Sequence, residues 1–253
     1  MRFSDYIATT QVFTTESLLS AVGKTASVRV SLSRASSEKK VSKVRNGLYV
    51  SKTGKFTGEL ADPYLIAQTF KPNAVFTYHS ALDLHGIAHS FSNRVQFTVT
   101  SRPLSFVYEG VWFIGYIRAD DLETQSVASH SFGTVTVTTR EQTFVDCLTN
   151  VSRAGGAEEV VRSLNGLLYV DVGLICAKVK SLSVAAISRI GWLLEMNRER
   201  WEVSSGQLEM LINLIPLTAS SHLDPDIKNS AAYNARWRLN LPATEKEIST
   251  WMA

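Results

Sequence analysis

The sequence predicts an α+β protein, with a winged helix-turn-helix at residues 1–57 followed by a larger mixed α/β domain at residues 58–253. Three observations support this prediction. Short helical patterns come first, an Asn-Gly pair then joins two strand-like runs, and positive charge is concentrated where the two patterns meet. From about residue 58 the charge becomes ordinary, and helix and strand patterns alternate toward the C-terminus. The order of helices followed by a hairpin is that of a winged helix-turn-helix.

The segment Lys24–Lys55 carries the charge. It holds nine Lys or Arg residues and one acid, Glu38, so its net charge is about +8, whereas the whole chain carries +3. The remainder therefore sums to about −5. Such segregation is typical of a protein that binds a polyanion. A solvated basic hairpin without a ligand remains the alternative.

The first helices are recognised by their apolar side and their ends. Phe3, Tyr6 and Ile7 predict a first helix of barely two turns. Thr14 and Thr15 precede Glu16, and threonine at the start, an acid in the first turn and Gly23 at the end delimit a second helix. Its apolar residues are Leu18, Leu19 and Val22.

A third helix is predicted to begin after Thr25, whose hydroxyl would cap its first turn. Val28, Leu32 and Ala35 recur at helical spacing and would face inward. The opposite face is small, hydroxylic or basic, which favours entry into a major groove. This outward set comprises Ala26, Arg29, Val30, Ser33 and Ser37, with Arg34 on the flank.

Individual side chains of this helix suggest how bases could be read. Arg29 or Arg34 is suited to the edge of a guanine, and Ser33 to a base or a phosphate. Val30 is unusual on an exposed face, since an apolar side chain in water gains no free energy from burial. Contact with a thymine methyl group and packing on a neighbouring domain both remain open explanations for Val30.

The hairpin follows the third helix. The runs Lys40–Val44 and Leu48–Val50 flank Arg45-Asn46-Gly47, and Asn-Gly accepts the backbone angles of a tight turn. Lys43, Arg45 and Asn46 would then lie against the phosphate backbone or in the minor groove. The expected DNA-binding residues are Thr25, Ser27, Arg29, Val30, Ser33, Arg34, Lys39, Lys40, Lys43, Arg45 and Asn46.

Residues 58–253 combine several helices and strands. Asp62-Pro63 predicts a helix start, Gly86 closes a helix over Ser80–His85, and Gly155-Gly156 precedes another helix. Strands are expected at 74–77, 94–100, 111–117 and 133–139, and further helices after Thr139, at Val184–Met196 and near Thr244.

The same residues contain little that indicates catalysis. His85 and His89 have metal-ligand spacing, but Gly86 interrupts the helix between them, and His79 is better explained by packing or capping. Asp224-Pro225-Asp226 lies in a loop-like stretch and is typical of a turn. We therefore expect a protein without enzymatic activity, cofactor or metal.

Cellular location follows from two observations. Cys147 and Cys176 sit among apolar residues far apart in the chain, which predicts small buried thiols in a reducing compartment. No apolar run is long enough to span a membrane, and the first residues lack a signal-peptide core. We expect a cytoplasmic protein that does not contact membranes.

Several motifs resemble one known family. The wing RNGLYV, the segment DPYLIAQTFKPNAVFTYHSALDLHGI, the segment REQTFVDCLTNVSRAGGAEEVV and the helix SRIGWLLE are similar to the AbiEi group, the antitoxins of type IV toxin–antitoxin systems. The resemblance implies a prokaryotic winged-helix protein that binds inverted repeats in its own promoter and represses its operon. It also implies that the C-terminal domain counteracts a nucleotidyltransferase-type toxin.

Carried onto this chain, the resemblance assigns DNA reading to the helix at 26–37 and the wing at 39–46. Two inverted repeats would bind two copies of the protein, which we expect to be a monomer or weak dimer in solution and to pair on DNA. How the toxin is counteracted stays open between direct contact, protection of the toxin's target and reversal of its modification. A transcription regulator with a ligand- or partner-sensing C-terminal domain is the alternative, followed by a nucleic-acid-processing enzyme.

Overall fold

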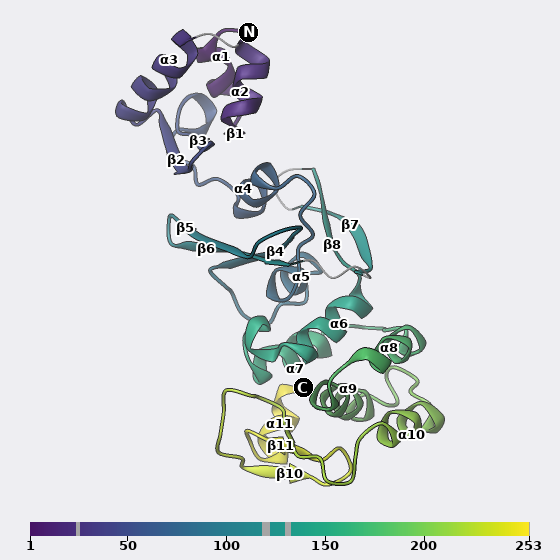
Figure 1. Cartoon of the computed structure of the whole chain (residues 1–253). Helices are drawn as coiled ribbons and strands as arrows, with labels where there is room; N and C mark the ends of the chain where they lie inside the picture. Colours follow the sequence, from purple (N-terminus) through teal and green to yellow (C-terminus); the bar gives the residue numbers. More distant parts are fainter. Residues whose placement is uncertain (24–25, 118–121, 130–132, 253) are drawn as a thin grey trace. The chain divides into compact units, whose positions relative to one another are not determined.

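The computed structural model describes residues 1–23, 26–117, 122–129 and 133–252 (Figure 1). It divides into two compact units. The first contains Met1–Ala74, Asn93–Arg118 and Ala128–Val135, and the second contains the intervening segments and Thr136–Ala253. The expected α+β fold class is confirmed: helices and a small antiparallel sheet form a winged helix-turn-helix, and a larger mixed α/β region follows. The boundary expected after residue 57 falls inside the first compact unit.

The winged helix-turn-helix has the expected helices and hairpin, and one additional strand. A three-residue strand, β1, separates the first two helices and pairs antiparallel with β3, so the sheet order is β1-β3-β2 (Figure 1). So short a strand leaves no alternation of polar and apolar residues to detect in the sequence. The elements are α1 (Phe3–Thr9), β1 (Val12–Thr14), α2 (Thr15–Val22), α3 (Ala26–Ser37), β2 (Val41–Arg45) and β3 (Leu48–Ser51).

Helix α2 illustrates how sequence sets these bounds. The Thr14 side chain accepts from the Ser17 amide, and the Ser17 side chain accepts from the Thr14 amide, which is a complete capping box. Gly23 ends the helix with φ 112°, an angle that glycine adopts without strain. The predicted start and end of α2 are thus both confirmed.

The small core of this part centres on Phe13. Tyr6 meets the Phe13 ring edge-on with ring centroids 5.5 Å apart, and Tyr49 stacks on it at 5.8 Å. Aromatic pairs in these geometries add to the free energy gained by burial alone. The buried members of the cluster are Tyr6, Ile7, Phe13, Leu18, Val28, Leu32, Ala35 and Val41.

The same unit includes a helix and a second sheet. Asp62 caps α4 by accepting from the Tyr64 amide at 2.7 Å, as Asp62-Pro63 predicted. In the sheet, ordered β4-β6-β5, β4 runs parallel to β6 and β5 antiparallel to it. Strand β5 was not predicted, because both of its faces carry apolar residues. The elements are η1 (Gly54–Phe56), α4 (Pro63–Phe70), β4 (Arg94–Val99), β5 (Leu104–Tyr108) and β6 (Val111–Ile117).

The second unit is mainly helical. Its core gathers around α6, α7 and α9, and both cysteines are free thiols buried within it, as expected. The strand expected at 74–77 is reduced to a single parallel bridge between Phe76 and Val137. No helix among the described residues has the length and apolar character needed to cross a membrane.

The remaining elements lie mostly in this second unit. The helices are α5 (His79–Leu84), α6 (Arg140–Thr149), η2 (Val151–Ala154), α7 (Ala157–Asn165), α8 (Val172–Lys178), η3 (Val179–Ser181), α9 (Val184–Met196), α10 (Ser205–Asn213) and α11 (Glu245–Trp251). The strands are β7 (Thr124–Ala128), β8 (Thr134–Thr138), β9 (Ser221–His222), β10 (Ala232–Asn234) and β11 (Leu239–Leu241). Strands β7 and β8, which pair with each other, and β9–β11 form the small sheets of this part of the chain.

Candidate nucleic-acid interface

Helix α3 presents the face that the sequence predicted. Val28, Leu32 and Ala35 are buried against the small core. On the opposite face, the Val30 side chain is 68% exposed. The exposed residues of the helix also include Ala26, Ser27, Arg29, Ser33, Arg34 and Ser37. The helix therefore offers a mostly polar and basic surface with one large apolar side chain on it.

Helix α3 ends in a tight turn that leads directly into strand β2 of the hairpin. The Lys40 amide donates to the Ala35 carbonyl at 2.9 Å and the Lys39 amide to the Ser36 carbonyl at 3.1 Å. This is the Schellman pattern, and Lys39 occupies its left-handed position with φ 57°, where glycine is usual. The turn fixes where β2 begins relative to α3.

The tip of the hairpin is also held in place. Arg45 pairs with Leu48 across the turn, and of the two turn residues, Asn46 and Gly47, only Gly47 has a positive φ, which is 81°. The Gly47 carbonyl accepts from the Thr15 amide at 2.9 Å, at the start of α2. The hairpin is thus tied to α3 at its base and to α2 at its tip.

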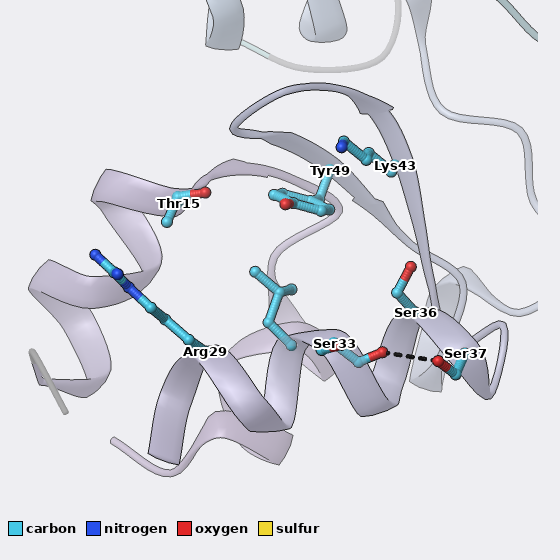
Figure 2. A pocket seen from close by; sticks show the side chains of 8 residues that line it. Thr15, Arg29, Ser33, Ser36, Ser37, Lys43 and Tyr49 are labelled. Atoms are coloured by element: carbon cyan, nitrogen blue, oxygen red, sulfur yellow. Dashed lines mark hydrogen bonds between the residues drawn. The ribbon is translucent and has the colours of Figure 1, made fainter. Parts of the chain in front are cut away.

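A cleft of about 490 Å³ lies between α3 and the hairpin (Figure 2). Figure 2 shows Arg29 and Ser33 on the α3 side, with Thr15, Tyr49 and Lys43 facing them from α2 and the hairpin. Hydroxyl groups supply most of the remaining polar surface. The lining residues are Thr15, Arg29, Leu32, Ser33, Ser36, Ser37, Lys43 and Tyr49.

The cleft is electropositive. None of its lining residues is acidic, and no acid in the described part of the chain forms an ion pair with Arg29 or Lys43. Glu38 is engaged elsewhere: its carboxylate binds Lys40 Nζ and Arg34 Nε, each at 2.8 Å. Hydrogen bonds from Lys40 and Arg34 lower the pKa of Glu38. Two of the expected cations are thus partly neutralised, and the uncompensated charge is concentrated on Arg29 and Lys43.

A second cleft of about 350 Å³ continues along the other side of β2 and shares Ser36 and Lys43 with the first. Lys39 contributes a further cation there. Lys52 also lines it but is paired with Glu109 at 2.9 Å. The two clefts share lining residues, so Arg29, Lys43 and Lys39 line adjoining clefts, and such cations can contact the phosphates of a nucleic-acid backbone.

Arg45 lines neither cleft and points instead at aromatic rings. Its guanidinium carbon lies 4.2 Å from the centroid of the Phe70 ring and 5.0 Å from that of Phe106. The cause is a register irregularity in β2 between Lys43 and Arg45, since a bulge re-aims the side chains on either side of it. Lys43 therefore lines the cleft, whereas Arg45 stacks on aromatic rings from α4 and β5.

The other expected residues are placed as follows. Ser27 and Asn46 are exposed outside both clefts, and Thr25 lies outside the described residues. Thr15 and Tyr49 line the cleft but were not expected. Tyr49 could have been identified because it alternates with the buried Leu48 and Val50. Thr15 gave no such signal, because its neighbourhood indicated only a helix start.

His79 and the backbone amide of His89 belong to a buried network around Glu159, whereas His85 Nε2 lies 2.8 Å from the Thr138 carbonyl oxygen. His79 Nε2 lies 3.2 Å from the Glu159 carboxylate, which also accepts from the His89 amide at 3.0 Å and the Ser163 hydroxyl at 2.7 Å. Burial raises the pKa of Glu159, but hydrogen bonds from His79, Ser90 and Ser163 outweigh it and lower the pKa to about 2. Among the described residues no three His, Cys, Asp or Glu side chains are placed to hold a metal ion.

The loop that contains Asp224 and Asp226 contacts the start of α7, next to Gly155-Gly156. The Asp224 carboxylate accepts from the Ala157 amide at 2.8 Å, directly after Gly155-Gly156, and from the Asp226 amide at 2.9 Å. The Asp224 carboxylate thus satisfies an amide at the start of α7 and closes its own turn. Neither motif forms an open site.

The fold was compared with known proteins. The crystal structure of the Rv2827c protein from Mycobacterium tuberculosis superposes with a TM-score of 0.69 over 98% of this chain and 92% of that chain. The two sequences are 13% identical, so the similarity concerns the fold. No protein-family model and no curated protein sequence matches the chain. This chain is therefore similar to Rv2827c in its fold throughout nearly its whole length.

Proposed function

We propose that the chain is a DNA-binding repressor that reads duplex DNA with α3 and holds its backbone with the hairpin. The observation that carries the proposal is the acid-free cleft between α3 and the hairpin, with Arg29 on one wall and Lys43 on the other. Nucleic-acid affinity comes largely from Lys and Arg contacts to phosphates. Both side chains lack an acidic partner among the described residues, so binding DNA would break no ion pair of theirs.

Double-stranded DNA is the form of nucleic acid that this surface fits. Helix α3 spans 12 residues and exposes side chains no larger than valine along the middle of its outer face, at Ala26, Val30 and Ser33. Such a helix can approach base edges in a major groove, which admits an α-helix. The deep, narrow major groove of an RNA duplex does not admit one.

The antitoxin role is a further part of the proposal. It is supported by the resemblance of the wing and of three later segments to the AbiEi group. On this proposal the protein binds inverted repeats upstream of its own operon, as a monomer or weak dimer that pairs on DNA. Its second unit would counteract a nucleotidyltransferase-type toxin encoded beside it. We propose no catalytic step, cofactor or metal for either role.

The DNA-binding proposal is tested by a gel shift on the DNA upstream of the protein's own gene. A scrambled duplex of equal length is the competitor, and two salt concentrations are used. We expect selective binding to the upstream DNA that persists at the higher salt. Equal binding to both duplexes, lost in salt, would contradict a repressor and leave only a basic surface.

The antitoxin proposal needs a separate test. The neighbouring reading frame is expressed with and without this protein, and growth is measured. We expect the nucleotidyltransferase to arrest growth alone and the full chain to restore it. Growth arrest that this protein does not relieve would contradict the antitoxin role and leave the repressor proposal standing.

A further inference from the structure

We propose that Val30 reads the C5-methyl group of a thymine in the operator half-site. This inference rests on the proposed DNA binding and names one feature of the DNA sequence that the protein prefers. Thymine is the base that presents a methyl group in the major groove, where an apolar side chain can bury it.

The first argument is exposure. The Val30 side chain is 68% exposed, although its neighbours at positions 28, 32 and 35 are buried. Valine is also a poor choice for an exposed helical position, because its branched side chain loses rotamer freedom there. Neither burial in the core nor helix stability therefore accounts for a valine at this position.

The second argument is position. An α-helix turns by about 100° per residue, which places Val30 about 160° around the helix axis from Val28 and about 160° from Leu32, on opposite sides. Val30 thus lies on the part of α3 farthest from the small core. Arg29 lies about 100° from Val30, on the side that lines the cleft. If Arg29 and Lys43 hold the phosphate backbone of the DNA, the outermost side of α3 faces the edges of the bases.

The third argument is charge, which distinguishes DNA from a protein partner. Arg29 adjoins Val30 on one side, and Arg34, four residues on, lies on the other, both exposed. An apolar protein surface that covered Val30 would also have to desolvate Arg29, which has no acidic partner among the described residues, and the Arg34–Glu38 ion pair, and both are costly to bury. A DNA groove has phosphates along both rims, so it can bury an apolar centre and pair the flanking cations at once.

The test uses the segment of upstream DNA that the protein protects in a footprint. Each thymine of one half-site is replaced in turn by deoxyuridine, which removes only the C5-methyl group. We expect one position at which wild-type binding weakens about three- to fivefold, the effect of about one methyl group. Val30→Ala should bind the unmodified operator more weakly by a similar factor and should be insensitive to deoxyuridine at that position.

Two further variants make the result specific. Val107→Ala removes an exposed valine outside α3 and both clefts and should keep the wild-type response to deoxyuridine. Val30→Thr keeps the branched shape and one methyl group and should keep part of the response. Thermal unfolding of each variant verifies that it is folded, which an exposed position favours.

The outcomes separate the inference from the proposed function. The role of Val30 would be overturned if the protein binds its operator selectively but no single deoxyuridine weakens that binding. It would also be overturned if the Val30→Ala variant responds to deoxyuridine as the wild type does. Failure of the wild-type protein to select its upstream DNA at all would instead overturn the proposed repressor function, and with it this inference.

Discussion

At the scale of single residues, charge at the interface depends on which cations keep an acidic partner. Arg34 and Lys40 share Glu38, and Lys52 binds Glu109, whereas Arg29 and Lys43 line the cleft without such a partner among the described residues. Counting basic residues in the sequence treats all of these cations alike. The structure distinguishes them, and it places Arg29 on the α3 wall of the cleft, opposite Lys43 on the hairpin, rather than on the outermost face of α3.

We therefore expect Arg29→Ala and Lys43→Ala to behave alike. Each should weaken binding to operator and random duplexes by a similar factor and reduce the salt-dependence slope by about 0.9, because each removes one phosphate contact. Fluorescence anisotropy at several salt concentrations measures both quantities. Lys180→Ala is the matched control, since it removes an exposed lysine from the second unit. A loss restricted to one operator base for Arg29→Ala would instead support pairing with guanine.

A second residue-scale prediction concerns pH. The pKa of Glu159 is about 2 in the folded protein, below the value of about 4.3 expected for an unfolded chain. A lowered pKa stabilises the fold above the unfolded value, and the stabilisation is lost as pH falls toward the folded value. We expect the free energy of unfolding to fall by about 2–3 kcal/mol between pH 6 and pH 2 from this group.

Thermal unfolding across that pH range measures the effect. Glu159→Gln should lower stability at pH 6 and flatten its decline toward pH 2. Glu158→Gln, one position earlier, is the control, because Glu158 is exposed and pairs only with Arg162 on the surface. An unchanged pH profile for Glu159→Gln would show that the buried network does not depend on its charge.

At the scale of elements, capping residues allowed the bounds of two helices to be predicted. Thr14 with Gly23 set the bounds of α2, and Asp62 set the start of α4. Strand β1 was not predicted, because three residues give too short a pattern and its partner β3 lies far along the chain. The face of α3 was correct because three apolar residues at helical spacing suffice to define it.

The hairpin was predicted, but its bulge was not, and the bulge directs Arg45 toward Phe70 and Phe106 instead of the cleft. We expect Arg45→Met to keep the contact with Phe70 and Phe106 and to retain the salt-dependence slope of wild-type DNA binding, since no phosphate contact is removed. Arg45→Ala should lose that contact and speed hydrogen exchange of the β2 and β3 amides. A slope reduced by about 0.9 in Arg45→Met would show that Arg45 contacts a phosphate after all.

At the scale of the whole molecule, the first compact unit extends beyond the winged helix. Arg45 stacks on Phe70 and Phe106, and Lys52 pairs with Glu109, so residues far along the chain support the hairpin. Composition alone indicated a boundary near residue 57, where the basic segment ends. A single sequence carries no local signal for contacts between positions 45 and 106, which is why the extent of this unit could not be predicted.

The fold class, the helix order and the charged segment were nevertheless predictable, and the similarity to Rv2827c covers both units. The proposed role depends on whether the cleft is what holds DNA. The most direct measurement is the dissociation constant of the full-length protein for its own upstream DNA and for a scrambled duplex, with the Arg29→Ala/Lys43→Ala variant alongside. We predict selective binding by the wild type and a loss of at least tenfold in the folded double variant. Unchanged affinity in the double variant would contradict the account, because DNA would then bind elsewhere on the molecule.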